Sequence, residues 1–493
     1  MGVESPYPRP SLSNPQSSTT EGSPATGLRR SIGLRTVVST SAGLTFASST
    51  FLVVVQMATY LAGDSAWIPI LIAGLLCALA AAAFSELNGM WPSVNGIRLY
   101  IHRAFGEKLS LLTALTYMSV VTLVVGTEAF VLSHVLNAAI PSISPPVWIF
   151  VMLSVATAIN FRGLKVAGAF QDIITYFVIA SIVTVSLIAL AKVHFHVPQP
   201  TLTGGFDPVF KALGVAVFLF VGFEWVTPLA DEVRHAKHIP LGMFIALILL
   251  VLVYSLATSA MFANFTGPNR ALLYGTDGHR IAIPHIVFAT AVLGPFGRWW
   301  MIVTSLCMSL TTFNAGLIGV SRFIYGMGRD QILPKSLAHL SARFSTPDRA
   351  VFLVYIIALT ISTLVVLTGR YVLLVNLAAA TESFIYAFAA ASVVSLRLKD
   401  KHRERPFRMT GGVWLPGLAA VVFATLGLGV FMQPEIEYWG AAVLFALTAL
   451  GWWVYIHFFA MPKLEKIRAE QAAKRQSRRP SRRPSKLEEK AEE

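Results

Sequence analysis

A glutamate lies inside an apolar segment of the sequence, next to two residues that interrupt helices. Residues 215–232 read V-A-V-F-L-F-V-G-F-E-W-V-T-P-L-A-D-E, with Glu224 two residues after Gly222 and four before Pro228. A carboxylate at membrane depth costs at least ~2.5–3.5 kcal/mol, and non-helical backbone is tolerated there only where protein or a cavity surrounds it. The segment is therefore either a kinked packing helix whose Glu224 bonds a neighbour, or part of a binding site.

Two more carboxylates, Glu128 and Glu382, lie in apolar segments without a Lys or Arg nearby in the sequence. Burial without a cationic partner favours the neutral carboxylic acid. Three interpretations of these glutamates are open: proton coupling, attraction of a cationic substrate, or a protonated carboxyl that bonds the backbone. Sodium coupling would need oxygen ligands such as the hydroxyls of Ser309 and Thr312. Such hydroxyls also commonly bond the carbonyls of their own helix.

The elements that must position these residues are membrane-spanning helices. The 493-residue chain is 55% hydrophobic and 13% charged, whereas a soluble domain carries about 25% charged residues. Apolar runs of roughly 20 residues recur, each long enough for a ~30 Å hydrocarbon core. This pattern predicts an all-α polytopic membrane protein with twelve transmembrane helices. They are expected near residues 36–61, 67–89, 109–137, 146–160, 169–191, 210–230, 240–264, 299–327, 350–368, 371–396, 413–432 and 439–460.

The basic residues that give the net charge of +14 are distributed as the topology of a membrane protein requires, so the charge does not indicate a nucleic-acid partner. Lys and Arg concentrate before the first span and in the loops after even-numbered spans, which predicts cytoplasmic N- and C-termini. Residues 1–30 are expected to be a disordered leader, residues 31–462 the membrane domain, and residues 463–493 a basic, charged cytoplasmic tail. The tail either contacts anionic lipid headgroups or stays solvated.

Several classes of site are not expected. Cys77 and Cys307 both lie in apolar runs, so neither a disulfide framework nor a cysteine metal site is predicted. The sequence contains no Walker loop, zinc-ligand spacing or nucleophile elbow. We therefore expect neither an enzyme nor a bound metal or cofactor.

The first and sixth predicted spans carry polar interruptions. They occur at residues 47–50, which read Ala-Ser-Ser-Thr, and around Gly222. They are five positions apart in the order of spans, so they occupy corresponding positions in two five-helix halves, residues 36–191 and 210–396. Two C-terminal spans at 413–460 follow these halves. Paired interruptions are typical of a 5+5 inverted repeat with discontinuous helices 1 and 6 and a site near the membrane midplane.

Four segments carry a resemblance to a known family. The chain resembles bacterial and fungal permeases of the amino acid–polyamine–organocation superfamily. The matching words are Ser85-Glu86-Leu87 with Met90-Trp91-Pro92-Ser93, Asn160-Phe161-Arg162-Gly163, Gly222-Phe223-Glu224 with Ala230-Asp231-Glu232, and Ser321-Arg322-Phe323-Ile324-Tyr325-Gly326-Met327 with Arg329-Asp330.

The sequence departs from this family in two places. Ala47-Ser48-Ser49 stands where the family usually has a Gly-x-Gly break. Val178, seven residues after Gln171, stands where some proton-coupled members carry a lysine. A lysine-based coupling mechanism is therefore not carried over to this chain.

The resemblance implies a secondary active transporter that moves amino acids by alternating access in the plasma membrane, with lipids and a small-molecule substrate as partners. H+ and Na+ are the candidate coupling ions. A transporter or exchanger of cationic amino acids or polyamines is the alternative, and a non-transporting amino acid sensor is an alternative of another class.

The expected site lies between the broken spans. Amides of the first break would donate to a substrate carboxylate, carbonyls of the sixth span would accept from its ammonium, and Phe223 would be an aromatic gate. The predicted substrate-binding residues are Phe46, Ala47, Ser48, Ser49, Thr50, Val217, Phe220, Val221, Gly222, Phe223, Glu224 and Trp225. The coupling or ion candidates are Glu128, Glu224, Ser309, Thr312 and Glu382, and the predicted cytoplasmic gate is Glu86, Asp231, Glu232, Arg322 and Arg329.

Overall fold

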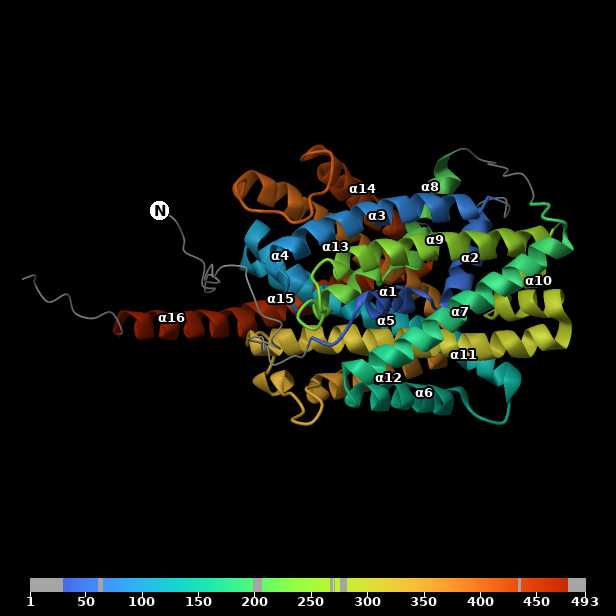
Figure 1. The fold of residues 1–493 in the computed structure, drawn as a ribbon, viewed down its shortest axis with the longest axis horizontal. Helices are drawn as coiled ribbons and strands as arrows, with labels where there is room; N and C mark the ends of the chain where they lie inside the picture. Colours follow the sequence, from blue (N-terminus) through green and yellow to red (C-terminus); the bar gives the residue numbers. More distant parts are fainter. Residues whose placement is uncertain are drawn as a thin grey trace, which may run out of the picture.

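The protein is a bundle of long helices, seen here in a computed structural model (Figure 1). The structure describes residues 30–60, 65–197, 206–266, 269, 271–274, 282–432 and 436–477. The predicted leader up to residue 29 and the tail beyond residue 477 lie outside the described residues. The helices are α1 (Leu34–Thr45), α2 (Ser49–Tyr60), α3 (Trp67–Met90), α4 (Gly96–Phe105), α5 (Glu107–Ala139), α6 (Pro145–Phe161), α7 (Leu164–Lys192), α8 (Phe206–Ala216), η1 (Val217–Phe220), η2 (Phe223–Leu229), α9 (His238–Asn264), α10 (Ala271–Tyr274), α11 (Pro284–Arg329), η4 (Lys335–Ala338), α12 (Asp348–Thr368), α13 (Tyr371–Lys399), α14 (Trp414–Phe431), α15 (Ile436–Tyr455), η5 (Ile456–Ala460) and α16 (Met461–Ser477).

The described helices have the lengths and compositions of membrane spans. Ten of them are long and apolar enough to cross a bilayer, and the bent pair α1 and α2 makes an eleventh. α6 is apolar but has 17 residues, short of the ~20 that a span usually needs. Residues Trp439–Glu470 form one continuous span from α15, η5 and the start of α16. Only 6% of its most apolar stretch is buried within the protein. Such an uncovered apolar face suits lipid, and the total of twelve spans stays a prediction.

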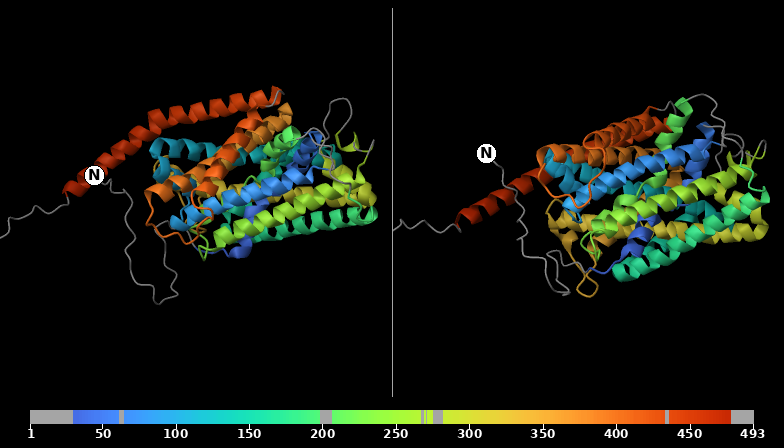
Figure 2. Two further views of the ribbon diagram at one scale, coloured as in Figure 1. Left: turned by 90° about the horizontal axis from the view of Figure 1, so that it is seen from above. Right: turned by 45° about the horizontal axis from the view of Figure 1, so that its top comes forward.

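Three segments differ from the sequence-based expectation. α11 begins at Pro284 within the expected loop 266–298 and bends at Gly294, where φ is +62° and Pro295 follows. The connection after α3 contains a helix of its own, α4. The chain after the last span continues as α16, which projects away from the bundle in every view (Figures 1 and 2). The part of α11 before its bend and helix α4 are short, and α16 is polar. None of them therefore has the long apolar signal that identifies a span.

The first span is broken where its polar residues lie. α1 ends at Thr45, α2 begins at Ser49, and their axes differ by 54°. Phe46, between them, has a ψ of 75°, outside the helical range. The break occurs without a glycine, because Ser and Thr side chains can bond the freed backbone. Thr50 Oγ1, for example, donates to the carbonyl of Ala47.

The sixth span is broken at Gly222. α8 passes into the 3₁₀ segment η1, Gly222 has a left-handed φ of +114°, and the 3₁₀ segment η2 follows with Pro228 inside it. An added Cβ at Gly222 would lie 2.7 Å from Cγ and Cδ2 of Leu44 in α1. The conformation and the close approach both require glycine, so Gly222 lets the two broken spans pack directly against each other.

We expect Gly222→Ala to lower the melting temperature of the purified protein, measured by thermal unfolding in detergent. Left-handed backbone alone costs a residue with a Cβ about 1–2 kcal/mol, and the contact with Leu44 adds to that cost. Gly451→Ala is the control, because an added Cβ on α15 meets no atom within 4 Å. Equal melting temperatures for the two variants would contradict the role given to Gly222.

Candidate functional site

The two breaks meet in the interior of the bundle. Ser41 Oγ of α1 donates to the carbonyl of Phe223 at 2.5 Å, beside the contact of Leu44 with Gly222. All twelve predicted substrate-binding residues are buried. The structure therefore brings these residues together from the two broken spans, in a conformation that shields them from solvent. Substrate binding by them stays a prediction.

Glu128 of α5 is bound to the break of the first span. Its carboxyl oxygens accept hydrogen bonds from the amides of Ser48 at 3.0 Å and Ser49 at 2.9 Å. Ser309 Oγ of α11 donates to the same carboxyl at 2.6 Å. A carboxylate is favourable at the N-terminus of a helix, here α2, because unpaired amides and the helix dipole point there. Glu128 thus ties three helices together at the break.

The amides of the first break, which were expected to face a substrate carboxylate, are occupied in this conformation. Ser48 and Ser49 donate to Glu128, Ala47 donates to the carbonyl of Thr45, and Thr50 donates to that of Ala47. The expectation of open amides is therefore corrected for this conformation. The reason is that hydrocarbon offers no water, so freed backbone groups bond to side chains or to each other.

The hydroxyls proposed for an ion site do face the break. Ser309 bonds Glu128, and Thr312 Oγ1 donates to the carbonyl of Phe46 at 3.5 Å. Tyr254 of α9 donates to the neighbouring carbonyl of Thr45 at 2.5 Å. Both predicted ion ligands thus act as donors here, and an ion at this position stays a prediction.

Glu224 is held by two tyrosines that sequence analysis missed. Tyr117 of α5 donates to it at 3.1 Å and Tyr386 of α13 at 2.8 Å. Glu382 lies beside Glu224, close enough for the two carboxyls to interact electrostatically. Apart from the carboxyl of Glu224, neither oxygen of Glu382 has a hydrogen-bond partner among the described residues. The sequence contained one usable signal: Tyr386 follows Glu382 by four residues, which places both on one face of a helix.

Aromatic rings surround this pair of carboxyls. The ring of Phe223 lies 5.6 Å from that of Tyr386. Trp225 stacks on Tyr117 at 4.0 Å and contacts Phe323 edge-on at 5.8 Å. The indole nitrogen of Trp225 is buried and has no hydrogen-bond partner among the described residues. The predicted gate Phe223 therefore lies next to the carboxyls, whereas Trp225 packs toward α5 and α11.

Four of the five predicted gate residues lie near one another. Arg322 Nε donates to Glu232 at 2.6 Å, and both side chains are buried. Burial raises the pKa of Asp231, while the nearby Arg329 and Arg30 oppose that shift. The backbone carbonyl of Glu232 accepts hydrogen bonds from the amides of Ser31 and Ile32. The start of α1 is thereby tied to the end of the sixth span.

Glu86, the fifth residue assigned to the gate, belongs to a different ion-pair network. Its carboxyl binds Arg397 through Nε at 2.9 Å and through Nη2, Arg405 at 3.1 Å, and the amide of Met409 at 2.9 Å. These partners come from the end of α13 and the loop that follows it. Its assignment to the gate is therefore corrected: Glu86 joins α3 to the connection between α13 and α14.

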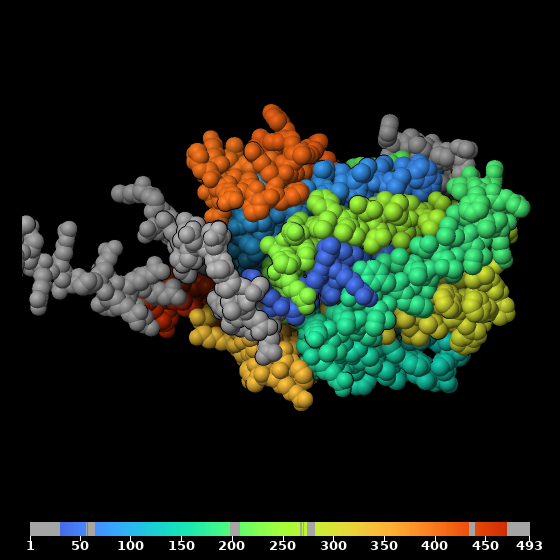
Figure 3. Space-filling model, viewed as in Figure 1, coloured from blue at the N-terminus to red at the C-terminus, as the bar shows by residue number. Residues whose placement is uncertain are grey.

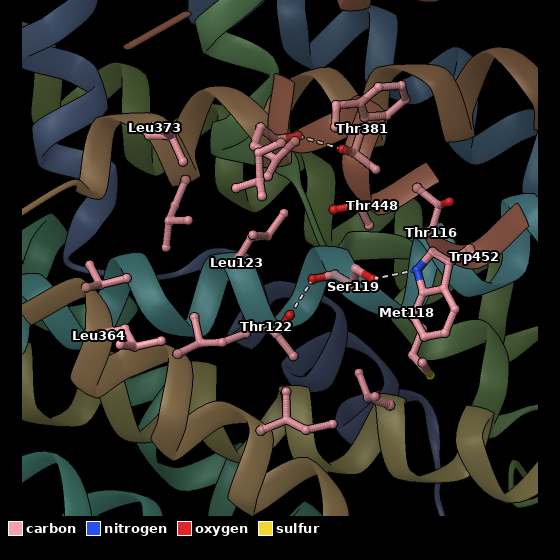
Figure 4. Close-up of a pocket in the computed structure, with 18 of the residues that line it drawn as sticks. Thr116, Met118, Ser119, Thr122, Leu123, Leu364, Leu373, Thr381, Thr448 and Trp452 are labelled. Carbon is pink, nitrogen blue, oxygen red and sulfur yellow. Dashed lines mark hydrogen bonds between the residues drawn. The ribbon is translucent and has the colours of Figure 1, made fainter. Parts of the chain in front are cut away.

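A separate apolar cavity of about 540 Å³ lies between α5, α11, α12, α13 and α15 (Figure 4). Several of its polar side chains form hydrogen bonds: Trp452 Nε1 donates to Ser119 Oγ at 3.3 Å, Thr122 to the carbonyl of Ser119 at 2.6 Å, and Thr381 to the carbonyl of Leu377 at 2.7 Å. None of the predicted site residues lines it. The cavity suits hydrocarbon, and it is distinct from the site at the breaks.

We expect Glu128→Gln to destabilise the protein more than Glu382→Gln. Glutamine keeps one acceptor oxygen but turns an NH₂ group toward the donors on Ser48, Ser49 and Ser309. Hydrogen bonds to a charged group contribute about 1.5–3 kcal/mol, whereas Glu382 has no such donor to lose. Melting temperatures in detergent measure the difference. Equal losses in both variants would show that the carboxyl of Glu128 does not hold the break.

The chain is similar to known transport proteins. Residues 32–458 match the family model described as "Amino acid permease". The chain is similar to the branched-chain amino acid permease BcaP of Bacillus subtilis (26% identity, 75% of this chain and 82% of the relative). It is also similar to the methylthioribose transporter of Bacillus subtilis (24%; 84% and 90%) and to the human Asc-type amino acid transporter 1 (25%; 76% and 72%). The chain therefore belongs to the amino acid permease family of the amino acid–polyamine–organocation superfamily.

Proposed function

We propose that this protein is a secondary active transporter that moves amino acids across the plasma membrane by alternating access, with both termini in the cytoplasm. The observation that carries the proposal is the meeting of two broken spans around buried, uncompensated carboxyls. The end of α1, directly before the break at residues 46–48, contacts the break at Gly222 through Leu44 and Ser41. Broken spans that meet in the interior are the usual place for a transported solute.

The substrate would be an amino acid bound between the breaks. Its ammonium group would approach Glu224 and the carbonyls of the sixth span, and its side chain would contact the aromatic rings of Phe223 and Phe46. Its carboxylate would use the amides of Ser48 and Ser49, which requires Glu128 to release them. The substrate carboxylate would then replace the carboxylate of Glu128 at the start of α2, so that the two amides keep a hydrogen-bond partner throughout transport.

Glu224 and Glu382 would form the proton-coupling site. Two carboxyls side by side away from water cannot both be ionised without a large cost, so the pair would share a proton. The hydroxyls of Tyr117 and Tyr386 donate to Glu224, which favours its ionised form over that of Glu382. Protonation from one side of the membrane and release on the other would couple transport to the proton gradient.

A cationic amino acid or a polyamine is the second candidate substrate. The specific support is that Glu128, Glu224 and Glu382 form no ion pair with a cation of the described chain. Competition in proteoliposomes separates the two candidates. Displacement of a labelled neutral amino acid by other neutral amino acids supports the first, and displacement only by arginine, lysine or putrescine supports the second. Binding without any flux would instead indicate a sensor.

We expect Glu224→Gln to remove the response of transport to a pH gradient. The probe is the amino acid that most raises the melting temperature of the purified protein, because a ligand stabilises the state it binds. In proteoliposomes, wild-type uptake of that amino acid should increase when the outside is more acidic, because protons are then driven inward. The variant should lose that increase, since glutamine cannot carry the proton.

Glu465→Gln is the matched control, because Glu465 is exposed on α16 far from the breaks. It should keep the wild-type response. A wild-type pH response in Glu224→Gln would contradict the assignment of proton coupling to this carboxyl.

A further inference from the structure

Five cationic side chains line one cavity at an end of the bundle. The cavity has a volume of about 330 Å³ and lies at the end of α13 and in the loop that leads to α14. This loop, drawn in orange, stands at the same end of the molecule as α4 (Figures 1 and 3). The lining residues are Arg397, Lys401, Arg403, Arg405 and Arg408.

Among the described carboxylates, Glu86 is the one that forms ion pairs with these cations, although Asp400 and Glu404 lie in the same loop. Glu86 is buried and accepts hydrogen bonds from Arg397, Arg405 and the amide of Met409. Lys401 and Arg408 have no ion pair or hydrogen bond with a described residue, and both are exposed. Several cations thus remain without an anion in a confined space. Like charges held together in this way attract an anionic ligand.

The inner wall of the cavity is held in place before any ligand arrives. Arg397 also donates to the carbonyl of Met409 at 2.6 Å. Arg403 donates to the carbonyl of Met90 at 3.1 Å and lies 4.3 Å from the ring of Trp91, which Arg103 approaches at 4.8 Å. A site whose side chains are already ordered loses little conformational entropy on binding.

Exposed apolar side chains flank the lining residues of the cavity in the sequence. Leu398 is 58% exposed and Trp414, at the start of α14, is 85% exposed. Tryptophan is enriched where the hydrocarbon meets the headgroups of a membrane. An exposed tryptophan so close in the sequence is what is expected of a loop at the level of lipid headgroups.

We propose that this cavity binds the phosphate of an anionic ligand, for which the headgroup of an anionic phospholipid is the favoured source. Guanidinium groups match phosphate oxygens with paired hydrogen bonds, and basic pockets at the cytoplasmic face of membrane helices recognise such headgroups. A bound phosphate would bridge Lys401 and Arg408 to the buried pair Arg397 and Arg405. The proposal is independent of the transported substrate and of proton coupling.

The test compares two double variants of the full chain in neutral detergent. Lys401→Gln with Arg408→Gln removes the two unpaired cations of the cavity. Lys335→Gln with Arg343→Gln removes the same charge from the exposed loop between α11 and α12. Native mass spectrometry measures binding of dioctanoyl-phosphatidylglycerol, with dioctanoyl-phosphatidylcholine as the zwitterionic comparison and inorganic phosphate as the free anion. Melting temperatures confirm that both variants are folded.

We expect phosphatidylglycerol to bind the Lys401 and Arg408 variant at least about tenfold more weakly than wild type, and the control variant to bind it as wild type does. Failure of excess inorganic phosphate to displace the lipid identifies a headgroup site. Binding of inorganic phosphate alone, with the same dependence on Lys401 and Arg408, identifies a site for a soluble phosphate. Equal weakening in the control variant, or no binding of either probe, overturns the proposal.

Discussion

In a water-free interior, every backbone amide and carbonyl needs a hydrogen-bond partner within the protein. This requirement constrains the rest of the structure. A helix that breaks inside a membrane exposes amides and carbonyls that lipid cannot bond, and each must find a partner in the protein. Here the partners are side chains from other helices. Glu128 takes the amides of Ser48 and Ser49, Ser41 bonds the carbonyl of Phe223, and Tyr254 bonds that of Thr45. The two breaks therefore exist only as part of the assembled bundle.

The three carboxyls in the interior differ in the number of hydrogen bonds that they accept. Glu128 has three donors, Glu224 has two tyrosine hydroxyls, and the oxygens of Glu382 have none among the described residues apart from the carboxyl of Glu224. A fully bonded carboxyl stabilises a conformation, whereas an unsatisfied one is costly and gains most from a change of protonation or a new partner. This gradient is consistent with a structural role for Glu128 and with the coupling role proposed for Glu224 and Glu382.

Buried ion pairs away from these three carboxyls form two networks with different partners. Glu232 and Arg322 connect the end of the sixth span to α11, and the start of α1 is hydrogen-bonded to the same place. Glu86 and its arginines connect α3 to the loop between α13 and α14. An ion pair that joins elements from different parts of the bundle can change when those elements move. The first network lies on the broken spans, and the second leaves several cations unpaired.

The sequence by itself determined the membrane class, most span positions and the two breaks, because hydrophobic length and local helix-breaking residues are properties of neighbouring positions. It did not reveal the first part of α11, from Pro284 to the bend at Gly294, since so short a stretch lacks the length signal of a span. Only the tertiary structure decided which carboxyl meets which donor. Tyr117 and Glu224 lie 107 positions apart, and Glu86 and Arg397 lie 311 apart. Pairing over such separations depends on how helices pack, which no local pattern of residues specifies.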